Sequence, residues 1–309
     1  MTGRISVIIP TLEAAGGIGG LIAAVRAQTF EAAEIIVVDS SSTDGTARMA
    51  RELGARVEVI PREKFDHGGT RTLAAKMAVG EILVFLTQDA LPADDRSLEN
   101  LVEPLREDKG IAASYGRQLP NPDATPLAAH LRLFNYGQRS YKKSLADKAG
   151  FGIKTVFLSD SFAAYRRSAL EAVGWFGQNL ICSEDSHAGA KLVLAGHRLA
   201  YAADAAVYHS HNYGALQEAR RYFDTGVFHG RERWILKEFG GAGAEGKRFV
   251  GSGLRYLADN GRLRLAPEFL FRTALKYVFY SLGKNYRYLP RFVIRRLGNN
   301  RRWWDKTVA

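Results

Sequence analysis

The sequence predicts an α/β protein built on a mostly parallel, doubly wound sheet, and three observations support this prediction. Short continuous apolar runs at 5–10, 34–39 and 82–86 are typical of strands that are buried on both faces. Helix-like segments follow such runs, for example 21–28 after the first and 46–53 after the second. Strands that alternate with helices in this way form a parallel sheet with helices packed on its faces.

The expected elements follow in a regular order through the first 90 residues. Strands are expected at 5–10, 34–39, 57–60 and 82–86, and helices at 21–28, 46–53 and 70–79. Residues 90–150 are more polar and contain three closely spaced prolines, Pro120, Pro122 and Pro126, so a surface excursion is expected there. Beyond it, strands are expected at 156–165 and 198–208, and helices at 167–173 and 186–195.

The pattern changes near residue 215, where helical segments rich in Arg, Lys and aromatic residues begin. A Gly-rich linker is expected within this region, at 240–246. We therefore expect two parts, an α/β domain at 1–214 and a basic helical region at 215–309.

The net charge of +11 comes from the C-terminal region. Residues 220–309 contain 20 Lys and Arg against 7 Asp and Glu, an excess of +13, which leaves −2 for the first 219 residues. Such a block attracts polyanions, either anionic lipid headgroups or nucleic acid, and charge alone does not distinguish them.

The chain has the features of a cytoplasmic protein. Its single cysteine, Cys182, cannot form an internal disulfide, which fits a reducing compartment. The N-terminal apolar run is interrupted by Pro10, too early for a signal peptide. The best membrane-span candidate, 269–282, is broken by Arg272 and Lys276, so the chain is not expected to span a bilayer.

Polar residues cluster where the expected strands end, and ligands of open α/β sheets bind at that edge. The strand-end segments are 10–11, 39–45 and 87–89, and a later segment, 183–185, supplies a further hydroxyl and two acids. A dinucleotide-binding enzyme is an alternative, because Gly17 and Gly19 give half of its glycine pattern. However, Ile22 occupies the third glycine position, which disfavours that alternative.

Three of these blocks together resemble the signature of family-2 inverting glycosyltransferases. The blocks are 6–11 (SVIIPT), 36–46 (IVVDSSSTDGT) and 183–185 (SED), and their order and spacing match as well. Residues 65–71 (FDHGGTR) with 86–90 (LTQDA) further resemble the bacterial rhamnosyltransferase branch, whose donor is dTDP-L-rhamnose. The resemblance covers about residues 4–212 and implies a GT-A fold, the fold of nucleotide-diphospho-sugar transferases.

The resemblance implies a nucleotide-sugar site formed by residues of these blocks: Pro10, Thr11, Glu13, Asp39, Ser41, His67, Gly68, Arg71, Gln88 and Asp89. Asp39 is able to accept hydrogen bonds from a pyrimidine or ribose, although it is also suited to a turn or helix cap. His67 and Arg71 flank a helix start that could bring N–H groups and a cation to a diphosphate. The alternative for that segment is an ordinary loop in which Arg71 is solvated.

Asp89 is the candidate ligand for a divalent metal, Mg²⁺ or Mn²⁺. In the family pattern two carboxylates flank one residue, and the second binds the metal between the donor phosphates; here Thr87 replaces the first. His209 and His211 lie where related enzymes place a histidine near the metal or diphosphate, so we include both as metal candidates. The alternative is a surface histidine pair.

Asp185 is the candidate catalytic base, because displacement at an anomeric carbon needs a base near the acceptor hydroxyl. Glu184 and Asp160 are expected to face the acceptor. The alternative is that Ser183 or Asp185 only caps the following helix.

The C-terminal region is expected to contact an anionic membrane surface. Its segments 291–296 (RFVIRR) and 300–304 (NRRWW) interleave cations with aromatic and apolar residues, as at membrane interfaces. A solvated basic face and a nucleic-acid surface are the alternatives, but no nucleic-acid module accompanies the charge, so no nucleic-acid partner is expected.

The combined interpretation is inverting transfer of a deoxyhexose, L-rhamnose, from dTDP-L-rhamnose to a hydroxyl of a lipid-linked saccharide in bacterial surface polysaccharide synthesis. The protein would act as a peripheral enzyme on the inner face of the cytoplasmic membrane. Two alternatives remain: a different UDP- or GDP-sugar donor, and a non-catalytic protein that binds lipid or nucleic acid on a degenerate GT-A scaffold.

Overall fold

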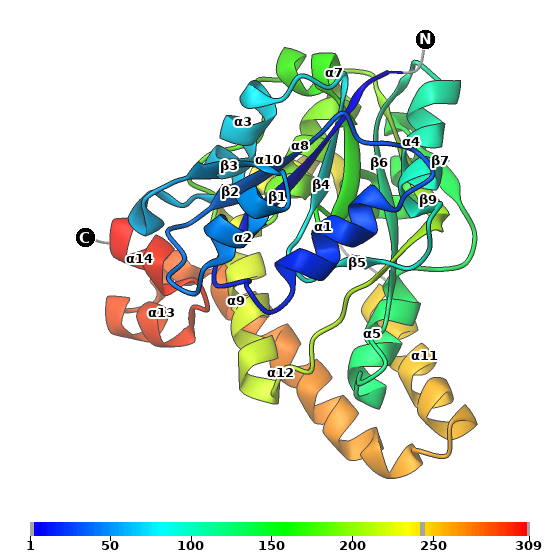
Figure 1. The fold of residues 1–309 in the computed structure, drawn as a ribbon. Helices are drawn as coiled ribbons and strands as arrows, with labels where there is room; N and C mark the ends of the chain where they lie inside the picture. The colour runs from blue at the N-terminus through cyan, green and yellow to red at the C-terminus, as the bar shows by residue number, and fades with distance from the viewer. Residues whose placement is uncertain (1–2, 242–244, 308–309) are drawn as a thin grey trace.

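The structure is a computed structural model that describes residues 3–241 and 245–307. Its central feature is one mixed sheet, which contains nine strands in the described residues, in the order β3-β2-β1-β4-β8-β6-β9-β5 with β7 paired to β9 (Figure 1). The strands are β1 Ile5–Thr11, β2 Glu34–Asp39, β3 Arg56–Val59, β4 Ile82–Leu86, β5 Leu91–Pro92, β6 Ile111–Leu119, β7 Tyr141–Lys143, β8 Phe162–Arg166 and β9 Arg198–Tyr208. Strands β1, β2, β3, β4, β6 and β9 run in one direction, whereas β5, β7 and β8 run against them. The predicted α/β class with a mostly parallel sheet is confirmed.

Helices cover both faces of this sheet, and several extend below it. Their bounds are α1 Ile18–Arg26, α2 Thr46–Glu52, α3 His67–Met77, α4 Ser97–Glu107, α5 Pro126–Asn135, α6 Lys148–Phe151, α7 Arg167–Ala172, α8 Glu184–Leu194, α9 Ala215–Arg231, α10 Arg233–Phe239, α11 Glu245–Asp259, α12 Ala266–Lys284, α13 Arg291–Leu297 and α14 Arg301–Thr307. Short 3₁₀ turns lie at Arg62–Lys64, Leu145–Asp147, Gly152–Val156, Leu263–Leu265 and Tyr286–Tyr288.

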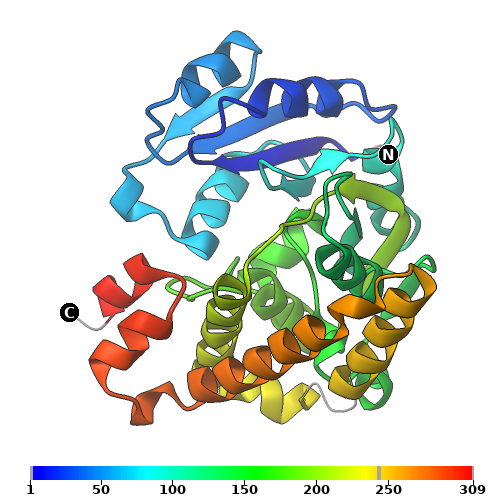
Figure 2. The ribbon, with the colours of Figure 1, turned by 90° about the horizontal axis from the view of Figure 1, so that it is seen from below.

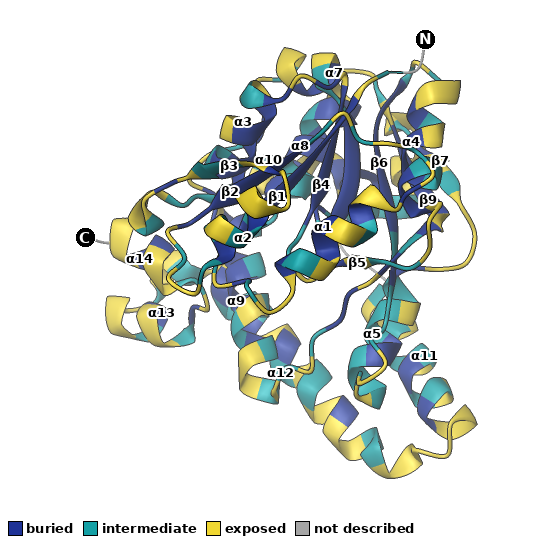
Figure 3. Ribbon diagram, viewed as in Figure 1, coloured by how far each residue is buried: buried dark blue, intermediate teal, exposed yellow. Residues whose placement is uncertain are grey.

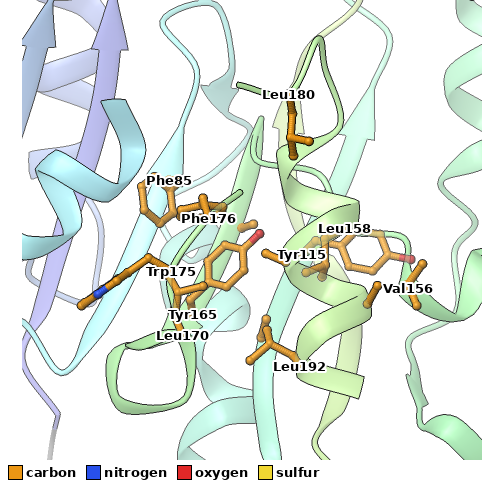
Figure 4. Packing of buried hydrophobic residues seen from close by; sticks show 14 of the residues in the cluster. Phe85, Tyr115, Val156, Leu158, Tyr165, Leu170, Trp175, Phe176, Leu180 and Leu192 are labelled. Carbon is orange, nitrogen blue, oxygen red and sulfur yellow. The ribbon is translucent and has the colours of Figure 1, made fainter. Parts of the chain in front are cut away.

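The two faces of the sheet carry separate apolar cores. Side chains of α1, α2 and α4 pack on one face, and those of α3, α7, α8 and the C-terminal helices pack on the other. The strands themselves are almost entirely buried (Figure 3). On the second face Phe85, Tyr165 and Phe176 contact one another edge to face, with ring centroids 5.1–5.6 Å apart (Figure 4). This packing fixes the carboxyl end of β4 and the amino end of β8, which lie side by side where the site is located.

The expectation of a surface excursion at 90–150 was wrong. Strand β6 lies inside the sheet between β8 and β9, and α4 covers it. The strand is hard to recognise because it contains buried polar residues: Ser114 bonds the Leu101 carbonyl, and Gln118 faces the site. The nearby prolines lie in the loop after the strand and at the first turn of α5, where proline is tolerated.

The predicted strand at 156–165 also begins later than expected. Residues 152–156 form a 3₁₀ turn, and β8 starts only at Phe162. The loop between them places Asp160 at the end of the sheet where the other site residues gather.

The C-terminal helices form a layer beneath the sheet edge (Figures 1 and 2). Helices α9 and α12 cross so closely that a Cβ on Gly283 would lie 2.0 Å from the Phe223 carbonyl oxygen. Their apolar residues belong to the same core as the sheet, and the proposed boundary near 215 stays a prediction. Part of the linker predicted at 240–246, residues 242–244, lies outside the described residues. None of the described helices has the length and apolarity that a bilayer span requires.

Trp303 and Trp304 do not lie at the surface, where the expected membrane contact would require them. Their side chains are 7% and 0% exposed, and both pack into the main core. Tyr286 and Phe223 contact the ring of Trp304. Aromatic burial of this extent fastens α14 to the body of the protein.

Candidate active site

A cleft of about 970 Å³ opens where the parallel strands end. Leu12 follows β1, Thr87 follows β4, Gln118 ends β6 and His209 follows β9, and all four line the cleft. The opposite wall comes from the C-terminal helices α9, α12 and α14. Ligand sites at this edge are the rule for open α/β sheets.

Three acids and one arginine form a buried cluster at the base of the cleft. The Arg71 guanidinium lies 3.0 Å from Asp160 Oδ2 through Nε and 3.0 Å from Glu184 Oε1 through Nη1. Tyr165 donates a 2.6 Å hydrogen bond to Asp160 Oδ1. Asp185 completes the cluster, since its Oδ2 accepts from the Asp160 backbone N–H at 3.3 Å.

The alternative in which Arg71 is a solvated loop residue was wrong. Its side chain is 6% exposed and is held by carboxylates on two sides. Burial of a guanidinium is tolerated only with such partners. This placement makes the residue a positioning cation for the acids, and contact between Arg71 and the donor diphosphate stays a prediction.

The start of α3 brings Arg71 and His67 to the cleft. Asp66 caps this helix by accepting from the Gly69 N–H at 2.6 Å, and its other oxygen accepts from the Asn179 N–H. Gly68 is required for packing, because a Cβ there would lie 1.8 Å from the Gly177 carbonyl oxygen. The predicted donor residue Gly68 thus contacts backbone in this structure.

The start of α8 positions Glu184 and Asp185. Ser183 adopts a left-handed conformation with φ of 63°, which costs energy for a residue with a side chain and is frequent at functional sites. Its hydroxyl does not cap the helix; the carboxylate of Asp185 instead accepts from the Ser186 N–H at 2.6 Å.

The three acids of the cluster differ in pKa because their surroundings differ. Burial and the neighbouring Glu184 carboxylate raise the pKa of Asp185 to about 7. Burial also raises the pKa of Asp160 well above its ordinary value. For Glu184 burial acts in the same direction, but the Arg71 guanidinium and His67 outweigh it and lower the pKa. Asp185 is consequently the acid whose pKa suits proton transfer near neutral pH.

A second group, formed by Asp89, His209 and His211, has the composition of a metal site. One ligand atom from each residue can be chosen so that all three lie within 4.8 Å of one another. The His209 Nε2 atom lies 3.4 Å from Asp89 Oδ1, and the His211 Nε2 atom lies 3.6 Å from Asp89 Oδ2. Burial and the neighbouring His209 lower the pKa of His211 to about 4, which leaves the ring neutral as a ligand requires.

Gln118 supports this group and was not predicted. Its Oε1 lies 3.0 Å from His209 Nδ1 and also accepts from Arg132. Because the amide oxygen only accepts, it holds the proton on Nδ1 and leaves Nε2 free to bind a cation. A buried polar residue in an apolar strand is the sequence signal that could have identified it.

The loops after β1 and β2 form a connected network around Asp39. Its Oδ1 accepts from the Thr11 and Ser42 hydroxyls at 3.0 and 2.6 Å, and its Oδ2 accepts from the Ser42 N–H at 2.8 Å. Asp39 is only 1% exposed, so it orders this turn, as the capping alternative expected. Contact between Asp39 and a donor stays a prediction.

The remaining predicted donor residues connect the loops after neighbouring strands to one another. Gln88 accepts from the Leu12 N–H at 2.8 Å and donates to its carbonyl at 3.1 Å. The Glu13 carboxylate accepts from the Thr43 N–H, and the Ser41 hydroxyl donates to the Ile60 carbonyl. Pro10 lies within β1, next to Val38 of β2.

The predicted residues thus lie in three places: in the lining of the cleft, next to the histidines of that lining, and behind the loop after β1. Asp160, Glu184, Asp185, His67 and Arg71 line the cleft, and His209 and His211 line it beside them. Asp89 contacts the two histidines from outside the lining, and Asp39 lies behind the loop that carries Leu12. The expected convergence of Asp39, Asp89 and Asp185 on one cleft therefore holds for Asp185 directly and for Asp89 through its histidines.

Similarity to solved structures defines the class of fold. The structure resembles mannosyltransferase PcManGT from Pyrobaculum calidifontis in complex with GDP-Man and Mn²⁺, with a TM-score of 0.64 and 19% identity over 93% of this chain and 88% of that one. It also resembles residues 1–349 of TarS from S. aureus, with a TM-score of 0.56 and 18% identity over 92% and 91% of the chains. This is the GT-A fold of glycosyltransferases.

The chain belongs to glycosyl transferase family 2, whose pattern matches residues 6–174. It is 44% identical over 304 residues to O-antigen chain rhamnosyltransferase RfbN of Salmonella typhimurium (strain LT2), covering 98% of this chain and 96% of that protein. It is 45% identical over 283 residues to O-antigen chain rhamnosyltransferase WbaN of Salmonella anatum, covering 91% and 89%. The predicted family and its rhamnosyltransferase-like branch are confirmed, and the protein is a glycosyltransferase.

Proposed function

We propose that the protein transfers L-rhamnose, with inversion, from dTDP-L-rhamnose to a hydroxyl of a lipid-linked saccharide during O-antigen synthesis. The names of the two relatives support rhamnose and O-antigen. The observation that carries the mechanism is the position of Asp185, a cleft-lining acid with a pKa raised to about 7 beside a buried arginine–carboxylate cluster.

In this proposal Asp185 is the base. The acceptor oxygen attacks the anomeric carbon of the sugar, its proton passes to an Asp185 carboxylate oxygen, and the bond to the diphosphate breaks with both electrons leaving on oxygen. Attack from the face opposite the leaving group inverts the anomeric centre. A base near pKa 7 is deprotonated at physiological pH and still basic enough to take the proton.

Arg71, Glu184 and Asp160 act as supports for this base. The guanidinium fixes Glu184 and Asp160 at 3.0 Å each, and the Asp160 backbone N–H holds Asp185. Glu184 also raises the pKa of Asp185 through its charge. We assign acceptor contact to the cleft-lining Glu184 and Asp185 and a purely structural role to the buried Asp160.

A divalent cation, Mg²⁺ or Mn²⁺, fits Asp89, His209 and His211, because one carboxylate and two imidazoles converge while Gln118 orients one ring. Bound there, it would supply positive charge to the donor diphosphate. Thr87 contributes no carboxylate, so the two histidines complete the ligand set. PcManGT, whose fold is similar, was solved with Mn²⁺.

An Asp185→Asn variant tests the assignment of the base. Asparagine keeps the shape and cannot accept the proton, so turnover is expected to fall by at least about 10³-fold while dTDP affinity stays within about two-fold. Asp259→Asn is the matched control, since Asp259 is exposed at the end of α11 and does not line the cleft. Rhamnose transfer by the Asp185→Asn variant at a near-normal rate would disprove the base.

We also propose that the protein works in the cytoplasm as a peripheral protein on an anionic membrane, bound through the outer face of α12 and the turn after it. Exposed apolar and aromatic side chains gather there: Leu263, Leu270, Phe271, Tyr277, Val278, Tyr288 and Phe292. Between residues 262 and 306 there are 12 Lys and Arg against 2 Asp and Glu, and seven of these cations do not line the cleft. Rings and cations in this combination suit lipid headgroups.

Sedimentation with lipid vesicles tests the membrane surface. Binding to vesicles with 30% phosphatidylglycerol is expected to exceed binding to pure phosphatidylcholine, and Phe271→Ser with Tyr277→Ser should weaken it about ten-fold or more. Val79→Ser is the control, because Val79 is also half exposed but lies after α3. Equal binding by the double variant and the control would exclude this face.

A further inference from the structure

The last helix, α14, is fastened to the loop that precedes the catalytic acids. The buried Asp224 carboxylate accepts from the backbone N–H groups of Asn299 and Asn300 at 3.2 and 2.8 Å. The Asn300 side chain donates to the Ile181 carbonyl at 3.1 Å, and the Trp303 indole donates to the Asn179 carbonyl at 2.9 Å. Helix α14 therefore belongs to the wall of the cleft.

The buried tryptophans determine which side chains of α14 face the cleft. With Trp303 and Trp304 packed inside, Arg301, Arg302 and Lys306 are exposed and line the cleft that also contains Asp185. Arg302 and Lys306 are four residues apart and thus share one side of the helix.

Arg221 of α9 links this wall to the metal candidates. Its guanidinium lies 5.0 Å from the centre of the Tyr213 ring, and the other neighbour of that ring is His211, stacked at 4.8 Å. Arg221 also lines the cleft. Arg221 thus places a positive group in the cleft between His211 and the cations of α14.

Among the described residues, Arg221 and the three α14 cations have no acidic partner, unlike Arg71 and Lys276 of the same cleft. Arg71 is paired with Asp160 and Glu184, and Lys276 is paired with Glu218. In the part of the chain that the structure describes, no carboxylate forms a salt bridge with the cleft-lining set Arg221, Arg301, Arg302 and Lys306. Like charges on one concave wall repel one another unless an anion joins them.

We propose that Arg221, Arg301, Arg302 and Lys306 form a diphosphate-binding subsite that holds the donor's nucleoside diphosphate and its leaving charge. This inference rests on the proposed sugar-nucleotide donor. It gives the C-terminal helix the role that sequence reasoning had assigned to Arg71. Guanidinium groups match phosphate oxygens with paired N–H donors, and their charge stabilises the diphosphate as it departs.

Ligand binding to purified full-length variants tests the subsite without any need for turnover. Titration calorimetry with dTDP, UDP, GDP and thymidine is expected to show that Arg301→Ala with Arg302→Ala weakens the preferred nucleoside diphosphate about ten-fold or more. Thymidine affinity should not change, because it has no phosphate. Arg296→Ala is the matched control, since Arg296 is exposed on α13 and does not line the cleft.

The outcomes separate this inference from the donor assignment. If UDP or GDP binds in place of dTDP, the rhamnose donor is wrong, and the subsite is still supported when the double variant loses that diphosphate. Unchanged diphosphate affinity in the double variant overturns the subsite. Binding of geranyl diphosphate to the double variant distinguishes a lipid diphosphate from the donor. If the double variant loses geranyl diphosphate binding and keeps its dTDP affinity, these cations bind a lipid diphosphate and the proposal is overturned.

Discussion

Replacement of Arg71 by methionine removes the single guanidinium that holds the acid cluster together. The guanidinium lies 3.0 Å from both Asp160 and Glu184, and all three side chains are less than 10% exposed. Removal of one partner from a buried ion pair costs about 3–5 kcal/mol of unfolding free energy, because the remaining charge stays buried without compensation. We expect a loss in this range at pH 7.5.

The loss should shrink as the pH falls. In the wild type, Arg71 and His67 outweigh burial and hold the pKa of Glu184 below its ordinary value. Without Arg71, burial dominates and raises that pKa above the unfolded value of about 4.3, so the folded variant binds a proton that the unfolded chain has released. Stability of the folded variant then rises as pH falls toward 4.3. Uptake of one proton recovers up to about 2.7 kcal/mol between pH 7.5 and 5.5.

Urea unfolding at pH 7.5 and pH 5.5 measures this difference. Arg71→Lys is expected to fall between methionine and the wild type, because one ammonium reaches only one of the two carboxylates well. Arg48→Met is the control: its pair with Glu52 is 74% and 60% exposed, so its loss should stay below about 1 kcal/mol. A loss below about 1 kcal/mol for Arg71→Met, or one that grows as the pH falls, would refute the reasoning.

Three further predictions concern the base, the metal group and the helix layer. The kcat/KM for rhamnose transfer should rise with pH and level off above about 7, the pKa of Asp185, since the base must be deprotonated; a pH-independent rate between 5.5 and 8 would contradict this. Gln118→Leu should weaken Mn²⁺ affinity about 10- to 100-fold, measured by metal titration with EDTA-treated protein, because His209 loses its orienting partner; an unchanged affinity would exclude that role. Gly283→Ala should cost about 1–3 kcal/mol in urea unfolding, because the methyl group would overlap the Phe223 carbonyl, whereas Gly246→Ala has open space and should be nearly neutral.

Much of the fold could be predicted from local pattern. Continuous apolar runs gave β1, β2 and β4, because strands buried on both faces need apolar residues at every position. Strand β6 escaped detection because its buried Ser114 and Gln118 interrupt that pattern and are satisfied by partners distant in sequence. Hydrogen bonding to such partners is visible only after folding.

The sequence by itself determined the fold class, the family resemblance, the strand end that carries Asp89 and the acidic block of Glu184 and Asp185, because these depend on local periodicity and on short blocks at fixed spacing. Only the tertiary structure decided how the charges are paired. In the folded protein Arg71 pairs with two acids, Gln118 contacts His209, and Trp303 is buried, so that α14 faces the cleft. The physical reason is that the energy of a charge or a ring depends on its surroundings in space, and those surroundings come from segments that are remote along the chain.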